Sequence, residues 1–211
     1  MRLPHATDWS ALRAPTPEDP WRVLVSGCLA GLPCGVDGTD YGMGGHPFPL
    51  FAMPTVRTRP FCPEDAGIGT PRTMPDIHGG DGRDVWAGRA RVRDERGADL
   101  TAGMQRGARA MADFAATHRV DLAVLTDMSA ACGTQVISLG CRYDEPRQFQ
   151  RGVGVAAAAL IAAGVPVVSQ RDDRSIARLC AMAEPGRPID PAARDHHERD
   201  WYRSCFGGAD R

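Results

Sequence analysis

Short apolar runs of strand length alternate with segments of helical period along most of the chain. Apolar residues at three- and four-residue steps predict a helix that Thr101 caps at its start. A second helix is predicted over 153–163 and ends at Gly164. The apolar positions of the first helix are Met104, Ala108, Met111 and Ala115. The predicted strands are 22–26 (RVLVS), 55–61 (TVRTRPF), 122–125 (LAVL) and 165–169 (VPVVS). This alternation predicts an α/β, Rossmann-like fold with a mainly parallel sheet flanked by helices.

Glycine and proline gather in two segments, 31–49 and 65–82, which follow the first two predicted strands. Both are therefore expected as loops at the carboxyl-terminal edge of the sheet. The second is too long for a plain turn, which is typical of a functional loop. Alternating charged and apolar residues at 89–93 (RARVR) predict one strand of a hairpin that turns at 94–97.

The same patterns divide the chain into three parts. Residues 1–20 are polar and proline-rich and are expected to form an N-terminal extension that packs loosely. Residues 21–180 hold all the predicted strands and are expected to form one domain. Residues 181–211 return to a polar, proline-rich composition, which predicts a C-terminal tail or a short helical appendage.

Composition narrows the possible functions. The 211 residues are 43% hydrophobic and 24% charged with a net charge of −1, so a folded domain without nucleic-acid binding is expected. All 25 basic residues are arginine, which excludes chemistry that needs a lysine, such as Schiff-base formation or the P-loop grip on phosphates. No apolar stretch reads as a signal peptide or a membrane span, and a cytoplasmic location is expected.

Seven cysteines, an odd number without C-x-x-C pairs, argue against a disulfide framework and a zinc ribbon. Cys28, Cys62 and Cys132 each closely follow a predicted strand. Because the carboxyl ends of parallel strands face the same edge of a sheet, these thiols are predicted to meet there. Thiolates suit iron–sulfur or zinc ligation, and three ligands leave a metal position open for substrate. The alternative is that the three are ordinary buried cysteines.

A set of motifs extends through residues 22–172 in consistent order. It comprises SGCLAG (26–31), VDG (36–38), CPEDAGIGTPR (62–72), GRARV (88–92), DLTAGMQRGA (99–108), SAACG (129–133) and GVAAAALIAAGVPVVSQ (154–170). Together these motifs resemble the DUF523 family, which includes a thiouracil desulfidase. The resemblance implies an oxygen-sensitive [4Fe–4S] cluster held by Cys28, Cys62 and Cys132, with the fourth iron free to take the substrate sulfur. It also implies that Glu64 is the acid–base carboxylate and Ser129 its hydroxyl partner.

The implied reaction is non-redox removal of sulfur from a thiopyrimidine, giving the oxo-base and sulfide. The partner is then a small molecule, either 2-thiouracil or a 4-thiouracil or 4-thiouridine nucleotide. Elementary chemistry agrees with this reaction, because a soft thiocarbonyl sulfur prefers to bind iron. Binding to iron would withdraw electrons from the adjacent carbon, which water then attacks. Glu64 would take a proton from that water, and Ser129 would relay a proton or fix the ring. Alternatively, Glu64 is a helix-start acid and Ser129 an N-cap.

Other residues leave alternatives open. Arg72 is a candidate for binding a substrate carbonyl or phosphate, or else forms a structural ion pair. Cys34 is either a fourth thiol near the cluster or a loop cysteine without an essential role. The remaining cysteines, Cys141, Cys180 and Cys205, are expected to be incidental, and the six histidines, His196 among them, are expected at the surface.

The chain departs from the family pattern around the presumed pocket. The family often reads C-R-Y-D-G where this chain has Cys34-Gly-Val-Asp-Gly38, and S-P-S-C-G where it has Ser129-Ala-Ala-Cys-Gly133. The segment from Gly133 to Gly154 is also a few residues longer. These changes bear on substrate identity. Rival functions are an open-cluster dehydratase, a non-catalytic iron–sulfur or sulfide-binding module, and a structural zinc domain.

Overall fold

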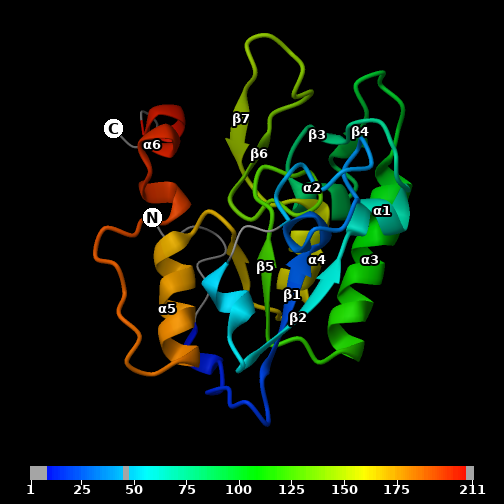
Figure 1. Cartoon of the computed structure of the whole chain (residues 1–211). Coiled ribbons are helices and arrows are strands. Elements are labelled where there is room, and N and C mark those ends of the chain that lie inside the picture. Colours follow the sequence, from blue (N-terminus) through cyan, green and yellow to red (C-terminus); the bar gives the residue numbers. More distant parts are fainter. Residues whose placement is uncertain (1–8, 45–47, 208–211) are drawn as a thin grey trace.

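A four-stranded parallel sheet forms the centre of the computed structural model, which describes residues 9–44 and 48–207 (Figure 1). The strands are β1 (Trp21–Ser26), β2 (Val56–Phe61), β5 (Leu122–Leu125) and β8 (Val167–Ser169). Their order across the sheet is β2-β1-β5-β8, and every neighbouring pair is parallel. The predicted strands and the α/β fold class are confirmed, with strand bounds within two residues of those expected.

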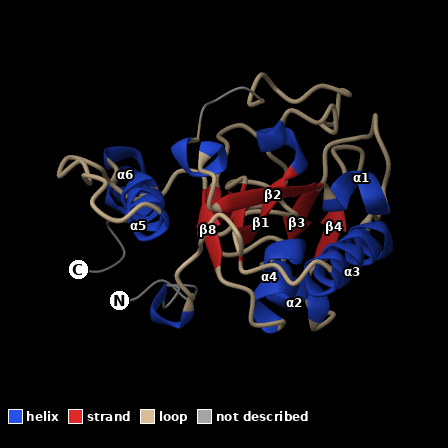
Figure 2. Ribbon diagram, turned by 60° about the horizontal axis from the view of Figure 1, so that its bottom comes forward, coloured by secondary structure: helices blue, strands red, loops and turns tan. Residues whose placement is uncertain are grey.

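The sheet is covered on both faces, because successive residues of its inner strands point to opposite sides. In β1, Leu24 packs into one core, whereas Val23 and Val25 pack into the other. The first core lies under α2 (Gly82–Trp86), α3 (Thr101–Thr117) and α4 (Val155–Ala162), which gather on one side of the sheet in Figure 2. The second is completed by η3 (Pro49–Ala52) and α5 (Asp173–Ala183).

Helix α3 matches its prediction in position and in its buried face. Its four predicted apolar positions are 0–2% exposed. The expected capping role of Thr101 is wrong, because Leu100 is the N-cap and Thr101 is the first helical residue. The hydroxyl of Thr101 instead accepts a hydrogen bond from the backbone N–H of Val92, at 3.0 Å, which ties the helix to a neighbouring strand.

Two small antiparallel sheets of two strands each lie beyond the carboxyl ends of the central strands (Figure 1). One pairs β3 (Asp76–His78) with β4 (Arg91–Arg93), and the other pairs β6 (Val136–Ser138) with β7 (Phe149–Arg151). A strand at 91–93 is confirmed, but its main partner comes from the predicted 65–82 loop. The expected hairpin around 94–97 amounts to a single bridge between Arg93 and Asp99.

Helix α1 (Pro63–Gly67) follows β2 and packs closely against α3. Glycine makes this approach possible, since a Cβ at Gly107 would lie 1.8 Å from the carbonyl oxygen of Pro63. The contact fixes where the first turn of α1 lies, and with it the side chains of Cys62 and Glu64.

Segments at both ends contact the domain. Residues 1–8 lie outside the described residues, and 9–20 are tied down through Arg13, whose carbonyl accepts from Trp21 Nε1 at 2.8 Å and whose guanidinium pairs with Asp121 at 3.2 Å. After α5 the chain forms η4 (His196–Glu198) and α6 (Asp200–Phe206). None of the described helices is long and apolar enough to cross a membrane.

The expectation that all histidines lie at the surface is wrong for His196. Its side chain is 1% exposed, and Nδ1 lies 2.8 Å from Oδ2 of Asp127, in the loop after β5. The ring also stacks on Trp201 and meets the edge of Tyr202, both in α6. Although residues 181–211 are polar in composition, the segment around His196 packs against the domain and buries this histidine.

Candidate active site

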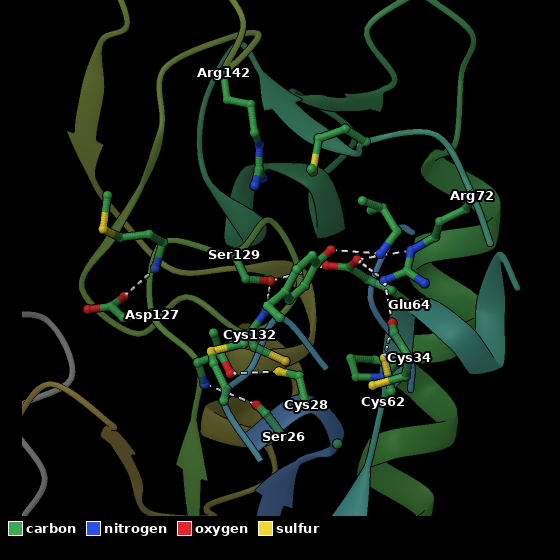
Figure 3. A pocket seen from close by; sticks show the side chains of 18 residues that line it. Ser26, Cys28, Cys34, Cys62, Glu64, Arg72, Asp127, Ser129, Cys132 and Arg142 are labelled. Atoms are coloured by element: carbon green, nitrogen blue, oxygen red, sulfur yellow. Dashed lines mark hydrogen bonds and ion pairs between the residues drawn. The ribbon is translucent and has the colours of Figure 1, made fainter. Parts of the chain in front are cut away.

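A cavity of about 340 Å³ lies where the loops after β1, β2 and β5 meet (Figure 3). All six residues predicted for the site line it: Cys28, Cys62, Glu64, Arg72, Ser129 and Cys132. They come from segments more than 100 residues apart in sequence. The carboxyl ends of adjacent parallel strands bring them together, as predicted for the three cysteines from their positions behind strands.

Each of the three predicted ligand thiols comes from a different loop. Cys28 lies in η2 (Gly27–Ala30) directly after β1, and its Sγ is 3.1 Å from the hydroxyl oxygen of Thr126. Cys62 is the N-cap of α1, where its Sγ accepts from the backbone N–H of Asp65 at 3.4 Å. Cys132 lies in the loop after β5 and is buried. Burial raises the pKa of the Cys28 thiol, and that of Cys132 lies well above its ordinary value for the same reason.

Cys34 brings a fourth thiol into the same cavity. Its side chain hydrogen-bonds to that of Cys62, which lowers the pKa of Cys62 and raises that of Cys34. Gly27 allows these thiols to crowd against the end of β1, because a Cβ there would lie 3.0 Å from the Sγ of Cys34. The sequence left the position of Cys34 open, and the structure places it beside Cys62. Of the described residues, no other cysteine lines the cavity.

Glu64 and Ser129 are hydrogen-bonded to each other across the cavity. The hydroxyl of Ser129 donates to Oε1 of Glu64 at 3.1 Å. The hydroxyl oxygen of Ser129 in turn accepts from the backbone N–H groups of Ala131 and Cys132, at 3.1 and 3.0 Å. Ser129 thus holds its own loop in the manner of a cap and also contacts the carboxylate. Its expected role in proton transfer or ring binding stays a prediction. Glu64 lies in the first turn of α1, with its side chain 13% exposed.

Arg72 pairs with the other oxygen of Glu64. Its Nε and Nη2 lie 3.1 and 2.5 Å from Oε2. The remaining N–H groups donate to protein oxygens: Nη2 to the carbonyl of Cys34, and Nη1 to Thr70 Oγ1 and to the carbonyl groups of Gly69 and Gly35. Since the side chain is only 4% exposed, these contacts support the ion-pair interpretation. Substrate binding by Arg72 stays a prediction.

Tyr41 fills the space beside Gly35. A Cβ at Gly35 would lie 2.8 Å from Cζ of Tyr41 and 2.6 Å from the carbonyl oxygen of Thr39. The tyrosine hydroxyl accepts from the backbone N–H of Val36 at 2.6 Å and lines the cavity. Tyr41 therefore occupies the space that a side chain at position 35 would need.

Two charged residues that line the cavity were missed from the sequence, Asp127 and Arg142. Asp127 follows β5 and holds the Ser129 loop, because Oδ1 accepts from the backbone N–H groups of Met128 and Thr134 at 3.0 and 2.9 Å. Burial alone would raise the pKa of Asp127, but hydrogen bonds from His196 and from backbone amides outweigh it, so the pKa lies below the ordinary value. Asp127 could have been found from the sequence, because an acidic residue shortly after a buried strand is a candidate for a site at the edge of the sheet. Arg142 lies in the lengthened 133–154 segment, where nothing in the pattern marked it.

Comparison with known proteins matches the part of the chain that forms the cavity. The family model described as 2-thiouracil desulfurase matches residues 23–172, which contain every cavity residue discussed above. The chain belongs to the 2-thiouracil desulfurase family. It is 30% identical over 151 residues to the protein YbbK of Bacillus subtilis (strain 168), covering 71% of this chain and 96% of that relative.

A solved structure shares the fold. The [4Fe-4S]-dependent thiouracil desulfidase TudS (DUF523Vcz) superposes with a TM-score of 0.63 at 28% sequence identity, covering 77% of this chain and 99% of that one. The resemblance to the DUF523 family and the fold expected from it are confirmed. Residues 1–22 and 173–211, including His196, lie outside the region that the family model matches.

Proposed function

We propose that this protein is an iron–sulfur-dependent, non-redox desulfidase that converts a thiopyrimidine and water into the oxo-base and sulfide. The observation that carries the proposal is the meeting of three loop thiols with the Glu64–Ser129 pair in one cavity. Family membership and the likeness to a [4Fe-4S]-dependent thiouracil desulfidase support it.

The donor set fits a [4Fe–4S] cluster. Cys28, Cys62 and Cys132 offer soft sulfur ligands from three separate loops, and iron–sulfur clusters are held by cysteine thiolates. The nearby carboxylate of Glu64 is already engaged by Arg72 and Ser129, so it does not compete as a ligand. When bound, the cluster would supply a Lewis-acidic iron with an open position for the thiocarbonyl sulfur.

Arg72 and Ser129 hold Glu64 in a position to accept a proton from water. Arg72 fixes Oε2 of Glu64, and Ser129 fixes Oε1, so the carboxylate keeps one orientation toward the cavity. A general base must hold such a position to take a proton from attacking water. Glu64 is assigned this role and then returns the proton to the departing sulfur, which leaves as sulfide. Ser129 is assigned to orient Glu64, because its proton already points to Oε1 while two amides occupy its oxygen.

Metal content tests the cluster. After anaerobic reconstitution, about four irons and four acid-labile sulfides per chain are expected. Cys62→Ala should lose or lower both. Cys180→Ala is the matched control, because Cys180 is buried in the second core and does not line the cavity. Zinc, or no metal in the wild type, would contradict the proposal.

Turnover tests the chemistry separately. With 2-thiouracil, the loaded wild type should release sulfide and uracil in equal amounts. Glu64→Gln should keep its iron and lower kcat about 10²–10⁴-fold, as loss of a general base does. Full turnover by Glu64→Gln would refute the assigned mechanism. A loaded cluster with no sulfide release from any thiopyrimidine would refute the desulfidase and favour a binding module.

A further inference from the structure

One charged side chain of the cavity has no part in the proposed proton transfer. Arg142 lies in the loop between β6 and β7, which projects over the carboxyl ends of the sheet strands (Figure 1). Its guanidinium points down into the cavity, from the side opposite the cysteines (Figure 3). A substrate whose sulfur faces the thiols would therefore present its far edge to Arg142.

Asp76 holds Arg142 in this orientation. The carboxylate of Asp76 accepts from the backbone N–H of Arg142 at 2.8 Å, from Nε at 3.0 Å and from Nη2 at 2.8 Å. Nη2 also donates to the carbonyl of Pro75 at 3.2 Å. The Asp76 and Arg142 side chains are 3% and 18% exposed. Because the guanidinium is already fixed, little side-chain entropy is lost when a ligand binds it.

The third nitrogen of the Arg142 guanidinium, Nη1, is available to donate a hydrogen bond to a ligand. Within residues 9–44 and 48–207, no hydrogen bond is formed by Nη1 of Arg142, and this atom is not sealed from the cavity. Arg72 differs, because all three of its nitrogens donate to protein oxygens. Of the two arginines in the cavity, Arg142 is the one with donor capacity to spare.

Charge and size favour a neutral ring over a nucleotide. Each arginine of the cavity is paired with a carboxylate, Arg72 with Glu64 and Arg142 with Asp76, so no surplus positive charge awaits a phosphate. At about 340 Å³ the cavity is near the lower end of the range for small-molecule sites, about 300–1,000 Å³, and a bound cluster would take part of this volume. Much of its remaining lining is apolar, including Met43, Met74 and Met128.

We propose that Nη1 of Arg142 donates a hydrogen bond to the exocyclic carbonyl oxygen of a neutral thiopyrimidine base. This contact selects rings that carry the oxygen over rings that lack it. The identity of the ring rests on the proposed function, whereas the carbonyl contact can be tested without turnover.

The test measures binding of two sulfur-free rings to the reconstituted protein by calorimetry. Uracil carries two exocyclic oxygens, and pyrimidin-2-one carries one. Wild type should bind uracil about 10- to 150-fold more tightly, as expected for a hydrogen bond from a charged donor. Arg142→Met should lose most of this preference, and kcat/KM for 2-thiouracil should fall by a similar factor.

Two further variants keep the result interpretable. Arg142→Met leaves the buried Asp76 unpaired, so the double variant Asp76→Asn/Arg142→Met removes both charges and should show the same loss of preference. Arg147→Met is the control, because Arg147 lies in the same loop but packs over Phe149 and does not line the cavity. Circular dichroism and iron content verify that each variant is folded and loaded.

The outcomes separate this inference from the desulfidase proposal. If no sulfide is released from 2-thiouracil, yet the uracil preference is present and depends on Arg142, the desulfidase proposal fails and the Arg142 contact stands. Equal uracil preference in wild type and both Arg142 variants, or no uracil binding by the wild type, overturns the contact even where sulfide is released. A fall in kcat/KM confined to 4-thiouridine monophosphate also overturns it, because Arg142 would then bind phosphate.

Discussion

Replacing His196 with alanine would leave the buried carboxylate of Asp127 without its closest side-chain partner. The two side chains are 1% and 0% exposed, and 2.8 Å separates Nδ1 from Oδ2. Ser169 Oγ, at 3.3 Å, remains on the same oxygen. Breaking a buried, hydrogen-bonded pair by removing one partner costs about 3–5 kcal/mol. For a domain of this size, about 2–4 °C of melting temperature corresponds to each kcal/mol, so a fall of about 6–20 °C is expected.

The pH dependence of this loss has a definite sign. The pKa of Asp127 is lowered in the folded protein: burial opposes the shift, but the interaction with His196 and the hydrogen bonds from backbone amides together outweigh burial. A carboxyl with a depressed folded pKa stabilises the protein above its unfolded pKa, and that contribution is lost as the pH falls through the folded value. The gap between wild type and His196→Ala is therefore full at pH 7 and narrows as the pH falls below the ordinary aspartate value of 3.8.

Thermal unfolding followed by circular dichroism under anaerobic conditions would measure the effect. His197→Ala is the matched control, because the neighbouring histidine is exposed. Asp127→Asn combined with His196→Ala should recover part of the loss, since no unpaired charge then remains. A melting temperature for His196→Ala within about 2 °C of the His197→Ala value would refute the reasoning, because it would mean that the C-terminal segment does not stabilise Asp127.

Three other predictions concern single positions. Cys34→Ala should keep about four irons per chain, whereas loss of iron equal to that in Cys62→Ala would show that Cys34 is a ligand. Gly107→Ala should displace α1 and lower both kcat and the melting temperature, and wild-type values in both measurements would contradict the close contact with Pro63. Burial raises the pKa of Asp172 to about 6, so wild type should lose roughly 3 kcal/mol of unfolding free energy between about pH 3 and pH 7 relative to Asp172→Asn. Parallel urea-unfolding profiles for these two proteins would argue against a buried charge at Asp172.

The central fold was predictable because its strands are buried on both faces. Such strands read as continuous apolar runs, and LAVL at 122–125 is a clear case. The two small antiparallel sheets were harder to predict. Strand β3 is three residues long and lies inside a glycine- and proline-rich segment, so no periodicity marked it. The pairing of β3 with β4 depends on tertiary contacts that local sequence does not encode.

The site was predictable where its residues follow strands. Cys28, Cys62 and Cys132 could be placed at one edge from topology alone, and the family resemblance added Glu64 and Ser129. The contacts of Arg142 and His196 could not be foreseen, because each depends on a single partner distant in sequence. Arg142 meets Asp76 from 66 residues away, and His196 meets Asp127 from 69 residues away.

The pairing of His196 with Asp127 has a consequence for how the protein matures in the cell. During synthesis, residues 23–172 emerge from the ribosome before His196 does, so Asp127, in the loop that carries Ser129 and Cys132, at first lacks its contact with His196. Docking of the later segment is then the event that sets this loop. On the proposed function, a nascent chain that stalled after residue 172 would hold all three proposed ligand thiols beside a loop that lacks this contact, so cluster insertion is expected after His196 has docked.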